Sequence, residues 1–161
     1  MRQDTGQASR EDQEPGYKNM RVWEKSFELA VAVFKIADRI PEALGLTLNG
    51  QIRITALSVP SQIARSQSNI SNRDYLRGLC LAQNSLAEME NQVQLCEELG
   101  YASELEVRRV GGQIREVRRM VSIVIGKLRA VVNEGRSLQT LSEEIAALIS
   151  NGNALPAGSR S

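Results

Sequence analysis

Seven basic residues and only three acidic ones lie between residues 102 and 132, which gives this stretch a local charge of +4. Because Arg108, Arg115 and Arg119 are separated by seven and four residues, they share one face of a helix. Arginine suits phosphate contact, since its guanidinium is always charged and binds two oxygens at once. The spacing therefore predicts a phosphate-binding face. The seven residues are Arg108, Arg109, Arg115, Arg118, Arg119, Lys127 and Arg129.

A second basic stretch spans residues 45–70, where two arginines stand with no acidic residue. The combined candidates for nucleic-acid binding are Arg53, Arg65, Arg108, Arg115, Arg118 and Arg119. An alternative stays open, because residues 71–101 sum to −3 and could neutralise the arginines internally. The acids available for this are Glu88, Glu90, Glu97 and Glu98. The whole chain carries a net charge of only +1, so any nucleic-acid surface must be local.

Composition argues against catalysis and metal binding. The 161 residues include no histidine, which excludes a Ser/His/Asp triad, a Cys/His pair and imidazole ligands. Two cysteines cannot form a tetrathiolate zinc site. Cys80 and Cys96 would lie about 24 Å apart along one helix, too far for a disulfide. We therefore expect a non-enzymatic protein with no catalytic residue, no cofactor, no metal and no small-molecule substrate.

The elements that position these residues are helices. Apolar residues recur at steps of three and four over about residues 19–40, 47–67, 71–100 and 103–132. Ser71 or Asn72 is a suitable N-cap, and Ser103 with Glu106 has the spacing of a capping box. Four such helices with short loops predict an all-α fold, an antiparallel up-down-up-down four-helix bundle.

The same pattern predicts the core. We expect Trp23, Phe27, Ala30, Phe34 and Ala37 in the first helix, and Leu48, Ile52, Ala56, Val59 and Ile63 in the second, which Pro60 should kink. The third should bury Tyr75, Leu79, Ala82, Leu86, Met89, Val93 and Cys96. The fourth should bury Val107, Val110, Ile114, Val117, Val121, Val124, Leu128 and Val131, with Gly111-Gly112 favouring frayed or bent first turns.

The two ends differ from the bundle, expected over residues 17–132. Residues 1–16 are polar and predict a disordered leader rather than a signal peptide. Residues 133–161 predict a flexible tail with a short amphipathic helix that packs back or docks on a partner. No apolar stretch is long enough for a membrane span, and the unpaired cysteines favour a cytoplasmic protein.

Apolar residues also occur away from the main stripes, more than one four-helix core requires. They include Ile36, Leu57, Leu76, Cys80, Leu95, Leu99, Ile123, Ile125 and Val132. Extra apolar faces of this kind favour association with further copies of the chain. The alternative is a wide core stripe with some exposed leucines.

Three stretches within residues 17–132 resemble a bacterial family of small bundle proteins. They are Val22-Trp23-Glu24-Lys25-Ser26; Gln51-Ile52-Arg53 with Ser58-Val59-Pro60-Ser61-Gln62-Ile63-Ala64; and Tyr75-Leu76-Arg77 with Ser85-Leu86-Ala87-Glu88-Met89-Glu90 and Leu99-Gly100-Tyr101. The family includes the 23S rRNA intervening-sequence proteins and the accessory variability proteins of diversity-generating retroelements.

This resemblance implies a ring-shaped homopentamer without enzymatic activity. In the retroelement branch it further implies a basic ring that binds structured RNA and a reverse transcriptase. We accordingly expect an oligomeric RNA-binding accessory subunit. The alternative is a protein-interaction scaffold without direct nucleic-acid binding, in which the tail or the apolar faces dock a partner.

Overall fold

Four α-helices make up the part of the chain that our computed structural model describes, residues 18, 20–41, 47–67 and 71–134. They are α1 (Arg21–Ala37), α3 (Leu48–Gln67), α4 (Asn72–Glu98) and α5 (Glu104–Glu134). No strand occurs in these described ranges, so the predicted all-α fold with four helices is confirmed. The predicted leader over residues 1–16 lies outside the described residues. Of the predicted tail over residues 133–161, residues 133 and 134 continue α5 and the rest lies outside the described residues.

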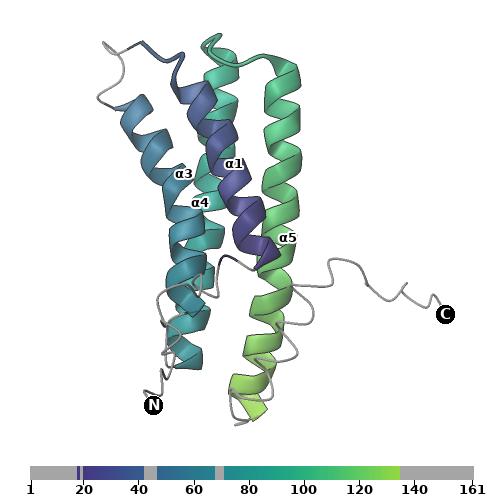
Figure 1. Cartoon of the computed structure of the whole chain (residues 1–161). Coiled ribbons are helices and arrows are strands. Elements are labelled where there is room, and N and C mark those ends of the chain that lie inside the picture. The colour runs from purple at the N-terminus through teal and green to yellow at the C-terminus, as the bar shows by residue number, and fades with distance from the viewer. Residues whose placement is uncertain (1–17, 19, 42–46, 68–70, 135–161) are drawn as a thin grey trace, which may run out of the picture.

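The helices pack side by side around one core (Figure 1). α1 packs against α3 and α5, and α4 packs against the same two helices. α1 and α4 therefore occupy opposite corners of the bundle, as do α3 and α5. This arrangement matters for the candidate site, because it separates the arginines of α3 from those of α5.

Local capping explains where two helices begin. The Ser71 side chain accepts a hydrogen bond from the Asp74 backbone N–H at 3.1 Å, which makes Ser71 the N-cap of α4. At the start of α5, the Ser103 backbone N–H donates to a Glu106 carboxylate oxygen at 3.0 Å, while the Glu106 N–H donates to Ser103 Oγ at 3.3 Å. Both predicted caps are confirmed. Gly100 follows α4 with a φ of +77°, a backbone region that favours glycine.

The predicted core is confirmed for three of the four helices. In α3, α4 and α5 each expected stripe is buried except for its first residue, which is half-buried. The half-buried residues are Leu48, Tyr75 and Val107, which pack against the edge of the core. Cys96 is buried and Cys80 half-buried, and both are free thiols that pack as small apolar side chains, as expected.

The predicted core of α1 is confirmed only in part. Ala30 and Ala37 are buried as expected, but Phe27 is 49% exposed. Trp23 and Phe34 are half-buried at the edge of the core. The residues that fill the core are Val22, Leu29, Val33 and Ile36, one or two positions away from the aromatic ones. Both sets follow the helical repeat, the buried one with Ser26 between Val22 and Leu29, so periodicity alone could not choose between them.

A close approach between α3 and α4 explains two small residues. A Cβ placed on Gly78 would lie 2.1 Å from Ser66 Oγ, a distance that no side chain could keep. Ser66 is itself buried, and its hydroxyl donates to the Gln62 carbonyl oxygen at 2.5 Å. α3 remains helical through Pro60, which is buried. The predicted kink at this residue stays a prediction.

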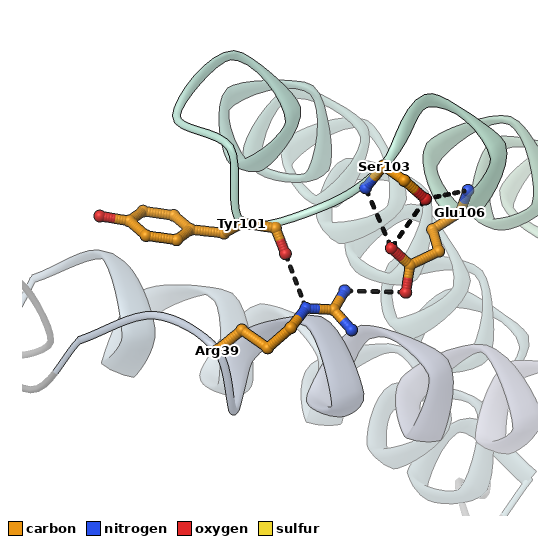
Figure 2. Close-up of polar contacts among 4 residues, drawn as sticks. All are labelled: Arg39, Tyr101, Ser103 and Glu106. Carbon is orange, nitrogen blue, oxygen red and sulfur yellow. Dashed lines mark hydrogen bonds and ion pairs between the residues drawn. The ribbon is translucent and has the colours of Figure 1, made fainter.

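Arg39, just beyond the end of α1, joins that helix to the α4–α5 connection (Figure 2). Its Nε donates to the Tyr101 carbonyl oxygen at 2.8 Å, and its Nη2 donates to Glu106 Oε1 at 2.8 Å. The other Glu106 oxygen accepts from Ser103, as described above. One carboxylate therefore completes the capping box of α5 and also holds α1 in place.

Candidate nucleic-acid interface

α5 carries the main group of predicted RNA-contacting residues on one long helix. The helix is continuous through Gly111 and Gly112, so the expected fraying of its first turns does not occur, whereas the expected bend stays a prediction. Arg115 and Arg119 are both exposed and lie one turn apart. Among the residues that the structure describes, no acidic side chain lies within ion-pair distance of either. Their charges are therefore available to a ligand.

The Arg115 guanidinium lies back along the helix, over the glycine pair. Its Nη1 is 3.4 Å from the position that a Cβ on Gly111 would take, and Nη2 is 3.9 Å from the equivalent position on Gly112. Side chains in helices point toward the preceding turn, which accounts for this direction. The exposed Arg115 guanidinium therefore lies beside the half-buried glycine pair.

Arg118 differs from its neighbours, because it faces α4. Its Nη2 donates to Glu90 Oε2 at 2.8 Å, and both side chains are partly buried. One turn further along α5, Ser122 Oγ accepts a hydrogen bond from Gln83 Nε2 at 2.7 Å. Glu90 and Gln83 both belong to α4. Arg118 thus forms part of the α4–α5 contact, which is the internal pairing that the sequence left open.

Two other candidates on the surface have different surroundings. Arg108 forms an ion pair with Glu104, one turn earlier in the same helix, and both side chains are largely exposed. Such exposed pairs are weak and exchange readily with other partners. Arg65 is exposed near the end of α3, with no ion pair to any described residue. Both side chains can therefore reach a ligand.

Arg53 has a structural role between α3 and α1. Its Nε donates to Asn49 Oδ1 and its Nη2 to Asp38 Oδ1, both at 2.5 Å. The guanidinium also lies over the Phe34 ring, with its carbon 4.9 Å from the ring centroid. A phosphate would have to displace the Asp38 contact to reach this guanidinium.

The structure therefore divides the six predicted residues into two groups. Four of them lie together on α5, whereas Arg53 and Arg65 lie on α3 at the opposite corner of the bundle. Arg109 and Arg129 are also exposed on α5 and were part of the basic stretch, although they were not among the six. Sequence reasoning missed Arg39, whose role depends on a contact between residues far apart in the chain.

The titratable groups of the bundle interior do not favour nucleophilic chemistry. Burial raises the pKa of the Cys96 thiol, partly offset by the nearby charge of Arg39, so this thiol is protonated at neutral pH. Burial also raises the pKa of the Tyr75 hydroxyl. The described ranges contain no group of three His, Cys, Asp or Glu side chains that could hold a metal ion. No helix within them combines the length and the apolar character that crossing a membrane demands.

Residues 18–123 match the family model of the 23S rRNA-intervening sequence protein. The chain belongs to this family. The match covers α1, α3 and α4 and continues into α5, so it includes the six candidate arginines but ends before Lys127 and Arg129. The family expected from the three sequence stretches is thereby confirmed. No relative among curated proteins matches the chain.

Proposed function

We propose that this 23S rRNA-intervening sequence family member is a non-catalytic accessory protein that binds structured RNA in the cytoplasm. The observation that carries the proposal is the pair of exposed arginines on α5, Arg115 and Arg119, without acidic partners among the described residues. Guanidinium groups one helical turn apart suit neighbouring phosphates of an RNA backbone. Arg108 adds charge on the same helix, and Arg118 supports the surface from its contact with Glu90. Arg65 offers a separate positive charge on α3.

Homo-oligomerisation is part of the same proposal. We propose that the protomer is an antiparallel up-down-up-down bundle, which is supported by the opposite order of contacts along α4 and α5, where Glu90 meets Arg118 and Gln83 meets Ser122. Five copies in a ring would repeat the Arg115–Arg119 pair around one assembly. Repetition strengthens binding, because each additional phosphate contact releases further counterions. A reverse transcriptase is the protein partner that we propose for this ring.

Filter binding of the purified protein to structured RNA across a salt series tests the RNA proposal. We expect affinity to fall linearly with the logarithm of salt concentration. Changing Arg115 and Arg119 together to Glu should abolish binding while circular dichroism shows unchanged helicity. Absence of binding by the unmodified protein at low salt, with and without a reverse transcriptase, would refute the proposal. Light scattering measures the number of copies.

A second candidate function is a protein-interaction scaffold without direct RNA binding. It is favoured by the large apolar side chains that remain more than 40% exposed on α1, α3 and α4. In this case, removing residues 133–161 should abolish capture of the protein partner while leaving the oligomer intact. RNA binding that survives the deletion, and that is lost on changing the α5 arginines, would favour the first function instead.

A further inference from the structure

One end of the bundle has an open corner, because α5 extends beyond the start of α1 (Figure 1). The contact of Arg39 with Glu106 fixes the relative position of the two helices at the other end. At the rise of an α-helix, α5 runs about 42 Å from Glu106 to Glu134, whereas the chain from Arg39 back to Arg21 runs about 27 Å. The last two to three turns of α5, roughly 15 Å, therefore lie beside a corner that no described helix fills.

Apolar side chains of α5 face this open corner. Val124 follows Glu106 by five helical turns, and Val131 follows Val124 by two, so both point to the side of α5 on which α1 lies. Val124 is level with the start of α1, whereas Val131 lies beyond it. Val131 is nevertheless only 7% exposed. Burial of this side chain requires a cover other than α1.

The sequence offers one apolar segment of matching length, residues 138–149, which lies outside the described residues. On a helix, its large apolar side chains would share one face, and the segment would be about 18 Å long. Only residues 135–137 separate it from the end of α5, a usual connection between antiparallel helices. The apolar residues of the segment are Leu138, Leu141, Ile145, Leu148 and Ile149.

The chain before α1 is a poor candidate for the same corner. Residues 1–16 contain no large apolar side chain except that of Met1. Such a polar stretch has little apolar surface to bury against Val131. Composition therefore favours the segment after α5.

We propose that residues 138–149 fold back as a helix antiparallel to α5 and occupy the open corner beyond the start of α1. Counted from the reversal of the chain, Leu141 would lie opposite Val131, and Ile145 opposite the fully buried Leu128. Burial of these side chains against each other supplies the driving force. The fold-back would complete four-helix packing at this end of the bundle. This inference depends neither on RNA binding nor on the proposed oligomer.

Amide hydrogen exchange of the full chain tests the proposal. We expect amides within residues 138–149 to be protected in the unmodified protein. Leu141→Glu with Ile145→Glu should abolish this protection and should speed exchange in the last turns of α5. A matched control, Thr140→Glu with Ala147→Glu, places the same charges on the opposite face of the segment and should retain the protection. Rapid exchange of the segment in the unmodified chain, or equal loss in both variants, would overturn the proposal.

A cross-link identifies what occupies the corner. In the full chain with Val131→Cys and Leu141→Cys, mild oxidation should join these two positions within one chain, since facing helices bring such pairs within disulfide range. Val131→Cys with Ala147→Cys is the control and should not cross-link. Peptide mapping separates this bond from any that involves Cys80 or Cys96. A bond that joins two chains would assign the corner to another copy, and protection that appears only after a reverse transcriptase is added would assign the segment to a partner. Either result would contradict docking within the chain.

Discussion

Arg118 donates a hydrogen bond to Glu90 across the α4–α5 contact at 2.8 Å. Arg115, three residues earlier, and Arg119, the next residue, reach no described acidic residue. Three arginines within five residues therefore have two different roles. The guanidinium that faces α4 holds the bundle together, and the two that face solvent remain available. Substituting any one of the three arginines with alanine removes one positive charge, so net charge alone predicts equal losses of RNA affinity. Their different contacts predict unequal losses.

Alanine substitutions of these three arginines should therefore have unequal effects on RNA affinity. Changing both Arg115 and Arg119 to Ala should make the plot of log affinity against log salt shallower by about 1.4 to 1.8, because each lost phosphate contact contributes roughly 0.7 to 0.9. Arg118→Ala should change this slope far less and should instead lower stability by up to about 1 kcal/mol. Equal slope changes for Arg118→Ala and Arg115→Ala would show that the Glu90 contact does not restrict Arg118. Filter binding and urea unfolding measure the two effects.

Gly78→Ala should destabilise the bundle by about 1 to 3 kcal/mol, the usual cost of forcing extra atoms into a packed contact. The new Cβ would meet Ser66 Oγ at 2.1 Å, so the hydroxyl would have to leave its bond to the Gln62 carbonyl oxygen. Adding Ser66→Ala should recover part of the loss, since it removes the clashing oxygen. Urea unfolding of both variants measures this. No recovery in the double variant would indicate that the helix backbones limit the approach.

Gly126→Ala in α5 should stabilise the bundle, in contrast to Gly78→Ala. No atom outside the local helix lies within 4 Å of the position its Cβ would take, and the residue is exposed within α5. Alanine is a better helix former than glycine, so the variant should be more stable by about 1 kcal/mol. The midpoint of thermal unfolding should rise accordingly. A fall in the midpoint would indicate that Gly126 packs closely against another molecule, because no atom of the single chain lies near its Cβ position.

The core face of α1 can be tested by truncation. Leu29→Ala should cost about 2 to 5 kcal/mol, because Leu29 is fully buried. Phe27→Ala removes a larger side chain and should nevertheless cost less than Leu29→Ala, since Phe27 is half exposed and stacks mainly on Trp23, with ring centroids 5.3 Å apart. Urea unfolding at several protein concentrations separates chain stability from assembly. A larger loss of stability for Phe27→Ala than for Leu29→Ala would indicate that Phe27 lies in the core, as the sequence predicted.

Glu106 should make a small, pH-dependent contribution to stability. Its pKa is lowered by the hydrogen bond from the Ser103 backbone N–H, then by the Ser103 hydroxyl and by Arg39. Because the folded pKa lies below the unfolded one, the contribution is present in full above the unfolded pKa, about 4.3, and is lost as pH falls through the folded pKa. The stability difference between the unmodified chain and Glu106→Gln should shrink between neutral and strongly acidic pH. A constant difference would mean that ionisation of Glu106 is irrelevant.

Most of the helix positions could be predicted because their signals are local. Ser71 and Ser103 are N-terminal caps that act on backbone groups three residues away, and Gly100 accepts a positive φ that other residues avoid. The main stripes of α4 and α5 are the longest regular series of apolar residues in their helices, with seven and eight members, and these are the series that the bundle buries. α1 contains two such series, and local pattern could not decide between Leu29 and Phe27.

The candidate site was predictable only as a set of charges. The spacing of Arg115 and Arg119 placed them on one helix face, but nothing local to the sequence distinguished them from Arg118. That distinction depends on Glu90, 28 residues earlier in the chain. Arg53 likewise was expected to contact phosphate, and its bonds to Asn49 and Asp38 emerged only once α1 and α3 were packed together.

The sequence by itself determined the fold class, the family, the approximate ends of four helices and the stretches where positive charge gathers. The family follows from the resemblance of three stretches, and the other properties follow from interactions over three to seven residues and from composition. Only the tertiary structure decided which face of α1 is buried, which arginines are paired and which apolar side chains stay exposed. Each of those outcomes depends on which helix lies next to which, because a partner on a neighbouring helix is distant in sequence and leaves no local pattern.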